Sequence, residues 1–360
     1  MALTTGVAAG LLAEPAIRAQ SSNPTARLVA APTVRMSGDV DSNSPAIWDL
    51  VDGRNVLHVL TSTAGQTSLA SGANVARLGR PAAVGFHPHP GHGVWIESVI
   101  TDGVGTWYGY YHNEIPADVC DRPERTIPRI GAARSRDQGR SWEDLGIILE
   151  APSGQMACHS SNQYFLGGVG DFSAVLDADA TTLYLFFSQY SPGANQQGVA
   201  VGRMLWAHRD QPVGRVDVWN RGTWLPPQPV FDEVDEAIIG WDHPFGTPLV
   251  DPSLPWHDAG GRTDAFWGPS IHWNAHLEQY VMLLNRAKDE HWAQEGIYVS
   301  FSPVLDDPLR WSAPQRILDG GGWYPQVIGL EPAAGTDKQA GARARFFMGG
   351  TSSYFIDFVK

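Results

Sequence analysis

Cysteine is scarce in this chain, which has only Cys120 and Cys158 among its 360 residues. Two thiols cannot supply the four-cysteine set of a zinc cluster or the several bridges that stabilise small secreted domains. They can form one bridge in an oxidising compartment, or they can be two unrelated buried thiols. The sequence therefore has neither a cysteine zinc cluster nor a disulfide framework.

Runs of basic residues are also missing. Lys and Arg total 25 against 38 Asp and Glu, a formal net charge of 25 − 38 = −13, and no Lys/Arg run interrupts this acidic balance. Such a charge disfavours partners that present rows of phosphates or anionic lipid headgroups. We therefore expect neither nucleic acid nor a membrane as partner.

The chain lacks an apolar run long enough to cross a bilayer, which takes about 20 residues. The weak apolar run within residues 1–20 has no basic residues before it, and Ala19 is small enough to precede a cleavage site. We interpret residues 1–20 as a signal segment truncated at its start and expect a secreted or periplasmic protein. Residues 21–360 are predicted to be a single domain, since closed all-β repeats often exceed the usual domain length.

Glycine, proline and tryptophan are abundant, with 39, 26 and 14 residues. This composition is typical of a turn-rich β protein. Most single tryptophans are expected in the core, but so many indoles also suit sugars, whose C–H faces pack on aromatic rings. An oligo- or polysaccharide is therefore the partner we expect, whereas the sequence indicates no oligomeric state.

One strand–turn–strand pattern recurs along the chain. It is clearest at residues 170–188, where Asp171 opens one strand, a polar turn follows, and an aromatic second strand ends the unit. The other four units lie at residues 41–62, 95–113, 266–285 and from Trp323 onward. A strand pair cannot bury its own apolar faces, so five units predict an all-β fold, a five-bladed β-propeller. A β-sandwich is the alternative.

Three further segments fit a propeller. Residues 21–38 are predicted to form an extended arm that closes the ring by joining the last blade. Residues 135–142 match the Asp-box pattern Ser-x-Asp-x-Gly-x-Ser/Thr-Trp, a hairpin turn in which Asp137 accepts amide hydrogens and Trp142 packs over the bend. Residues 207–262 are irregular and aromatic, and we expect them to be a substrate lid or a subunit contact.

Residues that open the innermost strand of each unit are expected to face the central funnel. Asp41, Glu97 and Asp171 occupy equivalent positions in three units, so we predict that they are the catalytic carboxyl groups. Polar and aromatic residues near the same strand ends make up the predicted substrate-binding set: Asn43, Trp95, Tyr111, His112, His159, Trp267, His272, Tyr324 and Gln326. No cofactor is required, although His272 could face a cation such as Ca²⁺ in the central channel.

The segment from Gly170 to Asp177, with the aromatic strand after it, resembles the third-blade motif of the five-bladed furanosidase-like glycoside hydrolases of families 43, 32, 62 and 117. This resemblance implies that Asp41 is a general base and that Asp171 positions the reacting groups. Those families have a Glu before a Gly-Pro pair in blade four as general acid. Here Trp267 stands before Gly268 and Pro269, so the expected acid is missing.

Acid-assisted glycoside cleavage needs a proton donor besides the base. Glu97 is our first candidate, because a desolvated glutamate beside Trp95 can keep its proton near neutral pH. His272 or His159 is the second choice, since the agarose-related members of the group are thought to use a histidine. The resemblance thus implies a glycosidase of the arabinofuranosidase or xylosidase type, exo-acting and inverting, for a plant or microbial glycan.

Two other functions remain open. A propeller polysaccharide lyase would use Tyr111, His112 or Tyr324 to abstract a proton from a uronic acid. A non-catalytic sugar-binding propeller would explain the missing glutamate of blade four. Fold analogy alone does not decide among the three.

Overall fold

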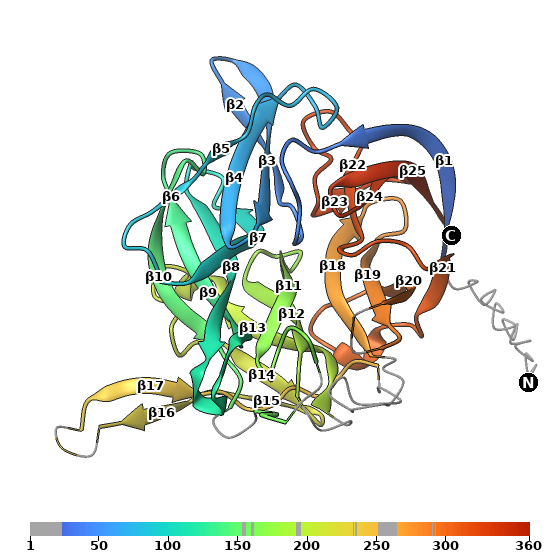
Figure 1. Ribbon diagram of the computed structural model, residues 1–360. Helices are drawn as coiled ribbons and strands as arrows, with labels where there is room; N and C mark the ends of the chain where they lie inside the picture. The colour runs from blue at the N-terminus through green and yellow to red at the C-terminus, as the bar shows by residue number, and fades with distance from the viewer. Residues whose placement is uncertain are drawn as a thin grey trace, which may run out of the picture.

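The structure is a computed structural model in which five β-sheets stand around a common axis (Figure 1). This arrangement confirms the predicted five-bladed β-propeller. The residues that the structure describes are 24–152, 156–159, 162–191, 196–232, 234, 236–250, 265–289, 291 and 293–360. The predicted signal segment, residues 1–20, lies outside them. Among the described residues, no helix has the length and hydrophobicity needed to span a membrane.

The first three blades follow one another along the chain. Blade one contains β2 (Ala46–Val51), β3 (Arg54–Thr63), β4 (Gln66–Gly72) and β5 (Ala82–Ala83). Blade two contains β7 (Gly93–Thr101), β8 (Trp107–Ala117), β9 (Arg122–Ser135), β10 (Ser141–Leu149) and β6 (Gly85–Phe86). Blade three contains β11 (Val169–Leu176), β12 (Thr182–Gln189), β13 (Gly198–Leu205), β14 (Asp217–Asn220) and β15 (Thr223–Leu225).

The last two blades share chain segments with their neighbours. Blade four contains β18 (Phe266–Asn274), β19 (Gln279–Ala287), β20 (Gln294–Ser302), β21 (Gln315–Asp319) and β23 (Gln339–Ala340). Blade five contains β22 (Gln326–Gly329), β24 (Arg343–Met348), β25 (Thr351–Val359) and β1 (Thr25–Arg35). Short 3-10 helices in the described part of the chain include η1 (Asp118–Cys120), η3 (Trp206–His208) and η4 (Pro308–Arg310).

The ring closes through its two ends. β1 pairs antiparallel with β25, from Thr25 opposite Val359 to Arg35 opposite Thr351. This confirms the predicted closing arm for the part of residues 21–38 that the structure describes. The pairing covers an edge that the last blade would otherwise expose.

The hydrophobic core lies between the blades. Each of five buried clusters joins a blade to its neighbour: Phe172 of blade three packs with residues of blade two, Tyr184 with blade four, and Phe346 of blade five with blade four. Leu60 and Phe347 belong to the two clusters that join blade one to blades two and five. The aromatic strands of the repeated pattern therefore fill the space between sheets, and each blade needs two neighbours to bury its faces.

The turn between β9 and β10 has the geometry that the Asp-box pattern predicts. The Asp137 carboxylate accepts the Ser141 backbone N–H at 2.9 Å and the Ser141 hydroxyl at 2.6 Å. Gly139 has φ +81°, a conformation that favours glycine, and Trp142 is buried over the bend.

The insertion at residues 207–262 is more regular than the sequence suggested. β14 and β15 extend blade three, and a separate hairpin of β16 (Gln228–Phe231) and β17 (Ile238–Asp242) projects away from the ring (Figure 1). Each of these short strands pairs antiparallel with its neighbour in sequence, β14 with β15 and β16 with β17. Residues 251–262 of the insertion lie outside the described part of the chain.

Candidate active site

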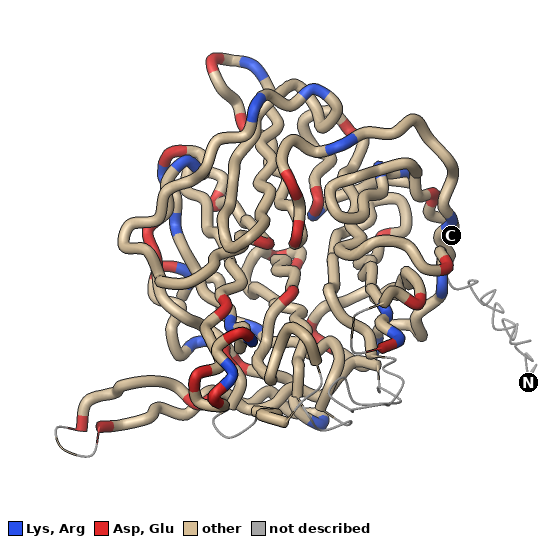
Figure 2. The backbone as a smooth tube through the Cα atoms, in the orientation of Figure 1, with Lys and Arg blue, Asp and Glu red and all other residues tan. Residues whose placement is uncertain are grey.

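One pocket, with a volume of about 190 Å³, is lined by residues of all five blades. Two kinds of side chain dominate its wall. The carboxyl groups are those of Asp41, Glu114, Glu124 and Asp171. The aromatic rings are those of Tyr164, Phe165, Trp267, Trp323 and Tyr324, and Thr126 and Gln163 complete the wall. Figure 2 shows acidic segments from separate parts of the chain meeting near the middle of the ring.

Asp41 reaches the pocket from the segment before β2. Its backbone N–H bonds to the Ser62 carbonyl at 2.7 Å, which fixes the segment against blade one, and its side chain is exposed to the pocket. Partial desolvation and the negative charges of Glu114 and Glu97 outweigh the attraction of His112 and raise the pKa of Asp41 to about 6. Asp41 therefore changes its protonation state close to neutral pH.

Asp171 comes from β11 and is almost fully buried. It lies at a β-bulge, where the pairing with β12 shifts between Gly170 and Phe172, and its φ is +39°. Such bulges redirect a side chain next to functional sites. The Tyr190 hydroxyl donates to one carboxylate oxygen of Asp171, and the Tyr324 hydroxyl donates to the other at 3.3 Å.

Burial has the largest effect on Asp171. It raises the pKa, as do the charges of Glu97 and Glu114, whereas the attraction of His112 and the hydrogen bond from Tyr190 lower it. The result is a pKa of about 7, well above the usual range of an aspartate. Asp171 therefore carries a proton for a large part of the time at neutral pH, which few surface carboxyl groups do.

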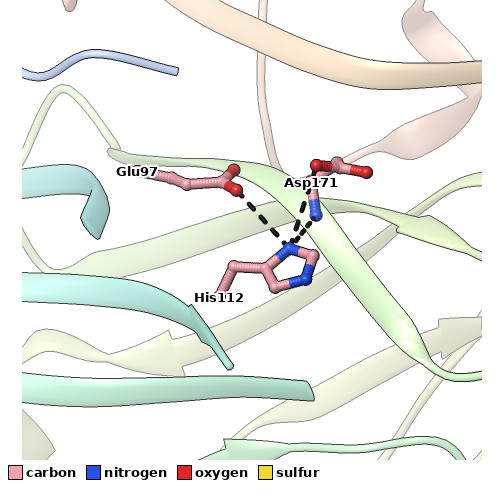
Figure 3. A group of neighbouring side chains, drawn as sticks. All are labelled: Glu97, His112 and Asp171. Atoms are coloured by element: carbon pink, nitrogen blue, oxygen red, sulfur yellow. Dashed lines mark hydrogen bonds and ion pairs between the residues drawn. The ribbon is translucent and has the colours of Figure 1, made fainter. Parts of the chain in front are cut away.

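His112, on β8, lies at the centre of the carboxyl groups (Figure 3). Its Nδ1 is 3.5 Å from Glu97 Oε1 and 3.8 Å from Asp171 Oδ1, and its Nε2 is 3.3 Å from Glu114 Oε1. The backbone N–H of Asp171 donates to Nδ1 at 3.1 Å, so the ring proton of the neutral form lies on Nε2, towards Glu114. One imidazole thus links a carboxyl group of the pocket wall, Glu114, to two buried ones.

The charges of this cluster are strongly coupled. Burial alone would lower the pKa of His112, but Glu114, Glu97 and Asp171 together raise it well above its usual value. Burial likewise acts to raise the pKa of Glu114, yet His112 and a 2.9 Å hydrogen bond from Thr126 hold it below the usual value. Glu114 is therefore an ionised carboxylate in the pocket wall.

Glu97 is buried beside the pocket and is not among the residues that line it. Its side chain is 1% exposed, and its Oε2 accepts the Phe172 backbone N–H at 2.7 Å. Burial raises its pKa, against the effects of His112, Phe172 and Lys338. Glu97 lies at a bulge in β7 between Ile96 and Ser98, with its carboxyl group against the backbone of blade three. Its role as the acid stays a prediction.

The remaining predicted residues divide into two groups. Trp267 and Tyr324 line the pocket together with Asp41 and Asp171. The others are placed elsewhere: Asn43, Trp95, Tyr111, His112, His159, His272 and Gln326 do not line it. His159 is exposed on its loop. The rings of Trp95 and His112 pack in a T-shaped arrangement, with their centroids 5.5 Å apart.

Two of these residues, Asn43 and Gln326, join different blades, whereas Tyr111 is bonded within blade two. Asn43 donates to the carbonyls of Phe172 and Pro269, both at 2.9 Å. Gln326 bonds to the N–H and the carbonyl of Ser44 at 2.6 and 2.9 Å. The buried Tyr111 hydroxyl donates to Asp144 at 2.6 Å. Their polar atoms form hydrogen bonds with other atoms of the protein, because buried polar groups on inner strands need partners.

Sequence reasoning missed one whole wall of the pocket. Gln163, Tyr164 and Phe165 lie on a segment that runs beside β9, where Thr126 N–H donates to the Tyr164 carbonyl at 3.1 Å and Leu166 N–H to the Thr126 carbonyl at 3.1 Å. A disulfide between Cys120 and Cys158 joins the same two parts of the chain. The single cysteine pair was the signal that could have indicated this contact.

A metal ion would find only one compact donor set among the described residues, formed by Glu97, His112 and Asp171, whose nearest ligand atoms lie within 4.8 Å of one another. Some of these atoms have partners within the protein: Nδ1 of His112 accepts the N–H of Asp171, and both oxygens of Asp171 accept tyrosine hydroxyls. Glu97 Oε1 and His112 Nε2 have no hydrogen-bond partner among the described residues.

No protein-family model and no curated protein sequence matches the chain. Solved structures do. An α-L-arabinanase of Penicillium chrysogenum, complexed with arabinobiose, is 13% identical, with 91% of this chain and 83% of that chain covered and a TM-score of 0.50. An endo-arabinase of Bacteroides thetaiotaomicron is 9% identical, with 90% and 97% covered and a TM-score of 0.49.

An exo-β-1,3-galactanase of Phanerochaete chrysosporium, complexed with β-1,3-galactotriose, is also similar, at 13% identity, with 91% of this chain and 64% of that chain covered and a TM-score of 0.48. Identities this low bear on the fold alone. The arabinanase comparison agrees with the five sheets around one axis and with the resemblance seen in the sequence. This chain therefore shares the five-bladed β-propeller fold of that arabinanase.

Proposed function

We propose that the protein is a glycoside hydrolase that removes sugar units from the end of a glycan. One observation carries this proposal: a single pocket on the propeller brings together four carboxyl groups and five aromatic rings. Carboxyl groups in different protonation states are the machinery of glycoside cleavage, and aromatic rings are suitable platforms for sugar rings. A volume of about 190 Å³ is of the order of one sugar unit, which suits a terminal residue.

Asp41 is the general base in this proposal. It is the pocket carboxyl group that the sequence resemblance implies for this role, and its pKa of about 6 leaves it ionised above that pH. A base works best when its pKa lies near the operating pH, because its basicity is then greatest among groups that are still ionised. Asp41 would take a proton from the attacking water.

Asp171 replaces Glu97 as the proposed general acid. Among the pocket carboxyl groups with a resolved shift, it has the highest pKa, about 7, and it retains a proton where Asp41 has lost its own. Groups whose environments push their pKa values apart are natural acid–base partners. Asp171 would protonate the leaving oxygen, and the ionised Glu114 would stabilise positive charge on the sugar ring in the transition state.

Two further observations bear on the substrate class. The pocket is small, and a structurally similar arabinanase is complexed with arabinobiose. We therefore propose an arabinofuranosidase- or xylosidase-type enzyme, inverting, for a plant or microbial glycan. The disulfide supports a secreted or periplasmic location, because such bridges persist in oxidising compartments.

Aryl glycosides test the two roles separately. With 4-nitrophenyl α-L-arabinofuranoside and β-D-xyloside as substrates, Asp41→Asn should lose about 10²–10⁴-fold in kcat and regain turnover with azide as external nucleophile. Asp171→Asn should lose as much on an unactivated disaccharide but retain activity on a 2,4-dinitrophenyl glycoside, whose leaving group needs no proton. Proton NMR of the first-formed anomer reports inversion.

Asp39→Asn is the matched control, since Asp39 lies two residues from Asp41, is exposed, and does not line the pocket. It should keep wild-type activity. Full activity of Asp41→Asn and Asp171→Asn would exclude the hydrolase mechanism, and sugar binding without turnover by the wild type would favour a non-catalytic propeller.

The lyase alternative loses support from the placement of its residues. Tyr111 donates to Asp144 and His112 lies behind the wall, which leaves Tyr324, whose hydroxyl donates to Asp171. None of the described residues that line the pocket is basic, and the amide of Gln163 is the group among them that could face a uronate carboxylate. An absorbance increase at the wavelength of unsaturated uronates would reverse this judgement.

A further inference from the structure

The chain has only three lysines, and one of them lies inside the ring. Lys288 and Lys360 are exposed, as is usual for this residue. The side chain of Lys338 is 17% exposed and lies between the innermost strands. A solvated lysine costs little free energy of folding, whereas burying its ammonium group is unfavourable unless several polar groups surround it.

The partners of the Lys338 ammonium come from three blades. Its Nζ donates to Ser173 Oγ of β11 at 2.9 Å and to Ser98 Oγ of β7 at 3.2 Å, and it lies 3.3 Å from Asp337 Oδ2. β7 and β11 contact each other, and β11 also contacts β18. Three oxygen ligands therefore surround one positive charge near the axis.

The same oxygens tie the blades together. Ser98 Oγ also accepts the Ala174 N–H of blade three at 2.8 Å, and Ser173 Oγ accepts the Ile271 N–H of blade four at 3.1 Å. Asp337 Oδ1 accepts the Ala46 N–H of blade one at 2.8 Å. The ammonium thus lies where hydrogen bonds from blades one, two, three and four meet.

His272 lies on the strand that pairs with the Lys338 segment. It is fully buried on β18, and neither ring nitrogen has a hydrogen-bond partner among the described residues. Burial, reinforced by the positive charge of Lys338, lowers the pKa of His272 to about 3, so the ring is neutral. The backbone of Lys338 is fixed as well, because its carbonyl accepts the Trp273 N–H at 2.9 Å.

We propose that the ammonium of Lys338 is the resident cation of the propeller axis, at the place beside His272 where the sequence suggested a metal ion. The fold then needs no calcium. Removal of the side chain would leave a small cage of two hydroxyls and a carboxylate, which is a donor set for a small cation such as ammonium or a divalent metal ion. This proposal does not depend on hydrolase activity.

Thermal melts of the whole chain test it. The wild-type Tm should be the same in EDTA and in calcium, and Lys338→Met, which fills the space without the charge, should lower Tm by about 5–10 °C. Lys338→Ala should also melt lower, and ammonium, methylammonium or calcium should raise its Tm with rising concentration. Lys360→Met is the matched control and should melt as the wild type.

Three results would overturn the proposal: a wild-type Tm that falls in EDTA, a Lys338→Met variant as stable as the wild type, or a Lys338→Ala variant that responds to none of the three cations. Reductive methylation of the folded wild type gives a readout that needs no variant. Mass spectrometry should find Lys288 and Lys360 modified and Lys338 protected, and equal modification of all three lysines would also contradict the proposal.

Discussion

The carboxyl groups of the pocket differ in charge state because each is buried to a different extent and has different charged and hydrogen-bonding neighbours. Asp171 is buried and repelled by other carboxyl groups, whereas Glu114 lies against His112 and Thr126. Identical functional groups within one small site therefore have pKa values on opposite sides of their usual range. This separation is what acid–base catalysis by two carboxyl groups requires.

The pH–activity profile should be a narrow bell. Activity needs Asp41 ionised, so it rises through a pKa of about 6, and it needs Asp171 protonated, so it falls through a pKa of about 7. We expect the maximum of kcat/KM between these two values. An optimum below pH 5, measured with a substrate whose leaving group needs protonation, would contradict the assignment.

Tyr190→Phe should move the alkaline limb of that profile. The Tyr190 hydroxyl donates to the Asp171 carboxylate and so favours its ionised form. Without this bond the pKa of Asp171 rises, and the loss of activity should begin at a higher pH. Tyr110→Phe is the matched control, because the buried Tyr110 hydroxyl has no hydrogen-bond partner in the described chain. A limb that stays in place in Tyr190→Phe would show that Asp171 does not set it.

The sequence allowed Asp41 and Asp171 to be predicted as residues facing the central pocket, because acidic residues open two of the repeated strand pairs. It did not allow the direction of Glu97 to be predicted. Glu97, like Asp171, lies at a bulge, where one extra residue breaks the alternation of side chains between the two faces of a strand. Bulges interrupt the corresponding strands β11 and β18 as well, and nothing in the composition of these strands marks them.

At the scale of elements, the hairpin of β8 and β9 extends beyond its blade and supplies Glu114, Glu124 and Thr126 to the pocket. Its tip holds Cys120, whose bridge to Cys158 fastens it to the segment that carries Tyr164 and Phe165. The strand–turn–strand pattern predicted these two strands. It could not predict the contact of their extension with a loop of the next unit, which depends on tertiary packing.

Replacing both cysteines by serine should destabilise this part of the protein. The bridge spans 38 residues, for which loop-closure entropy gives a stabilisation of about 4 kcal/mol. We expect a lower denaturation midpoint in guanidinium and a higher KM, because the aromatic wall at Tyr164 and Phe165 loses its anchor. Reduction of the wild type should give the same two changes. Unchanged KM in both would show that the wall holds its position without the bridge.

For the whole molecule, the buried groups of the site make stability depend on pH. Asp41, Asp171, Glu97 and His112 all have folded pKa values raised above their usual ones. A raised pKa means a contribution that is fully present below the unfolded value and is lost as the pH rises through the folded value. Tm should therefore be higher at pH 5 than at pH 8, and calorimetry in both buffers measures it. The opposite order would mean that Glu114 and other groups with lowered pKa values dominate.

Removal of β1 should open the ring. Deletion of residues 24–35 takes away the partner of β25 and exposes a strand edge together with apolar residues of the last blade such as Phe358. We expect a lower Tm and concentration-dependent association in size-exclusion chromatography. A change of Arg27 to Ala, which removes only its exposed 3.5 Å ion pair with Asp357, is the control and should cost less than about 1 kcal/mol.

The pairing of β1 with β25 also affects when, during synthesis, the ring can close. Arg27 and its partner Asp357 are separated by 330 positions, so a ribosome makes one side of the seam long before the other. During that interval β1 has no partner strand, and the blades that are made first form an open arc. The ring of a nascent chain can therefore close only after β25 has been made, when the two sides of the seam first meet.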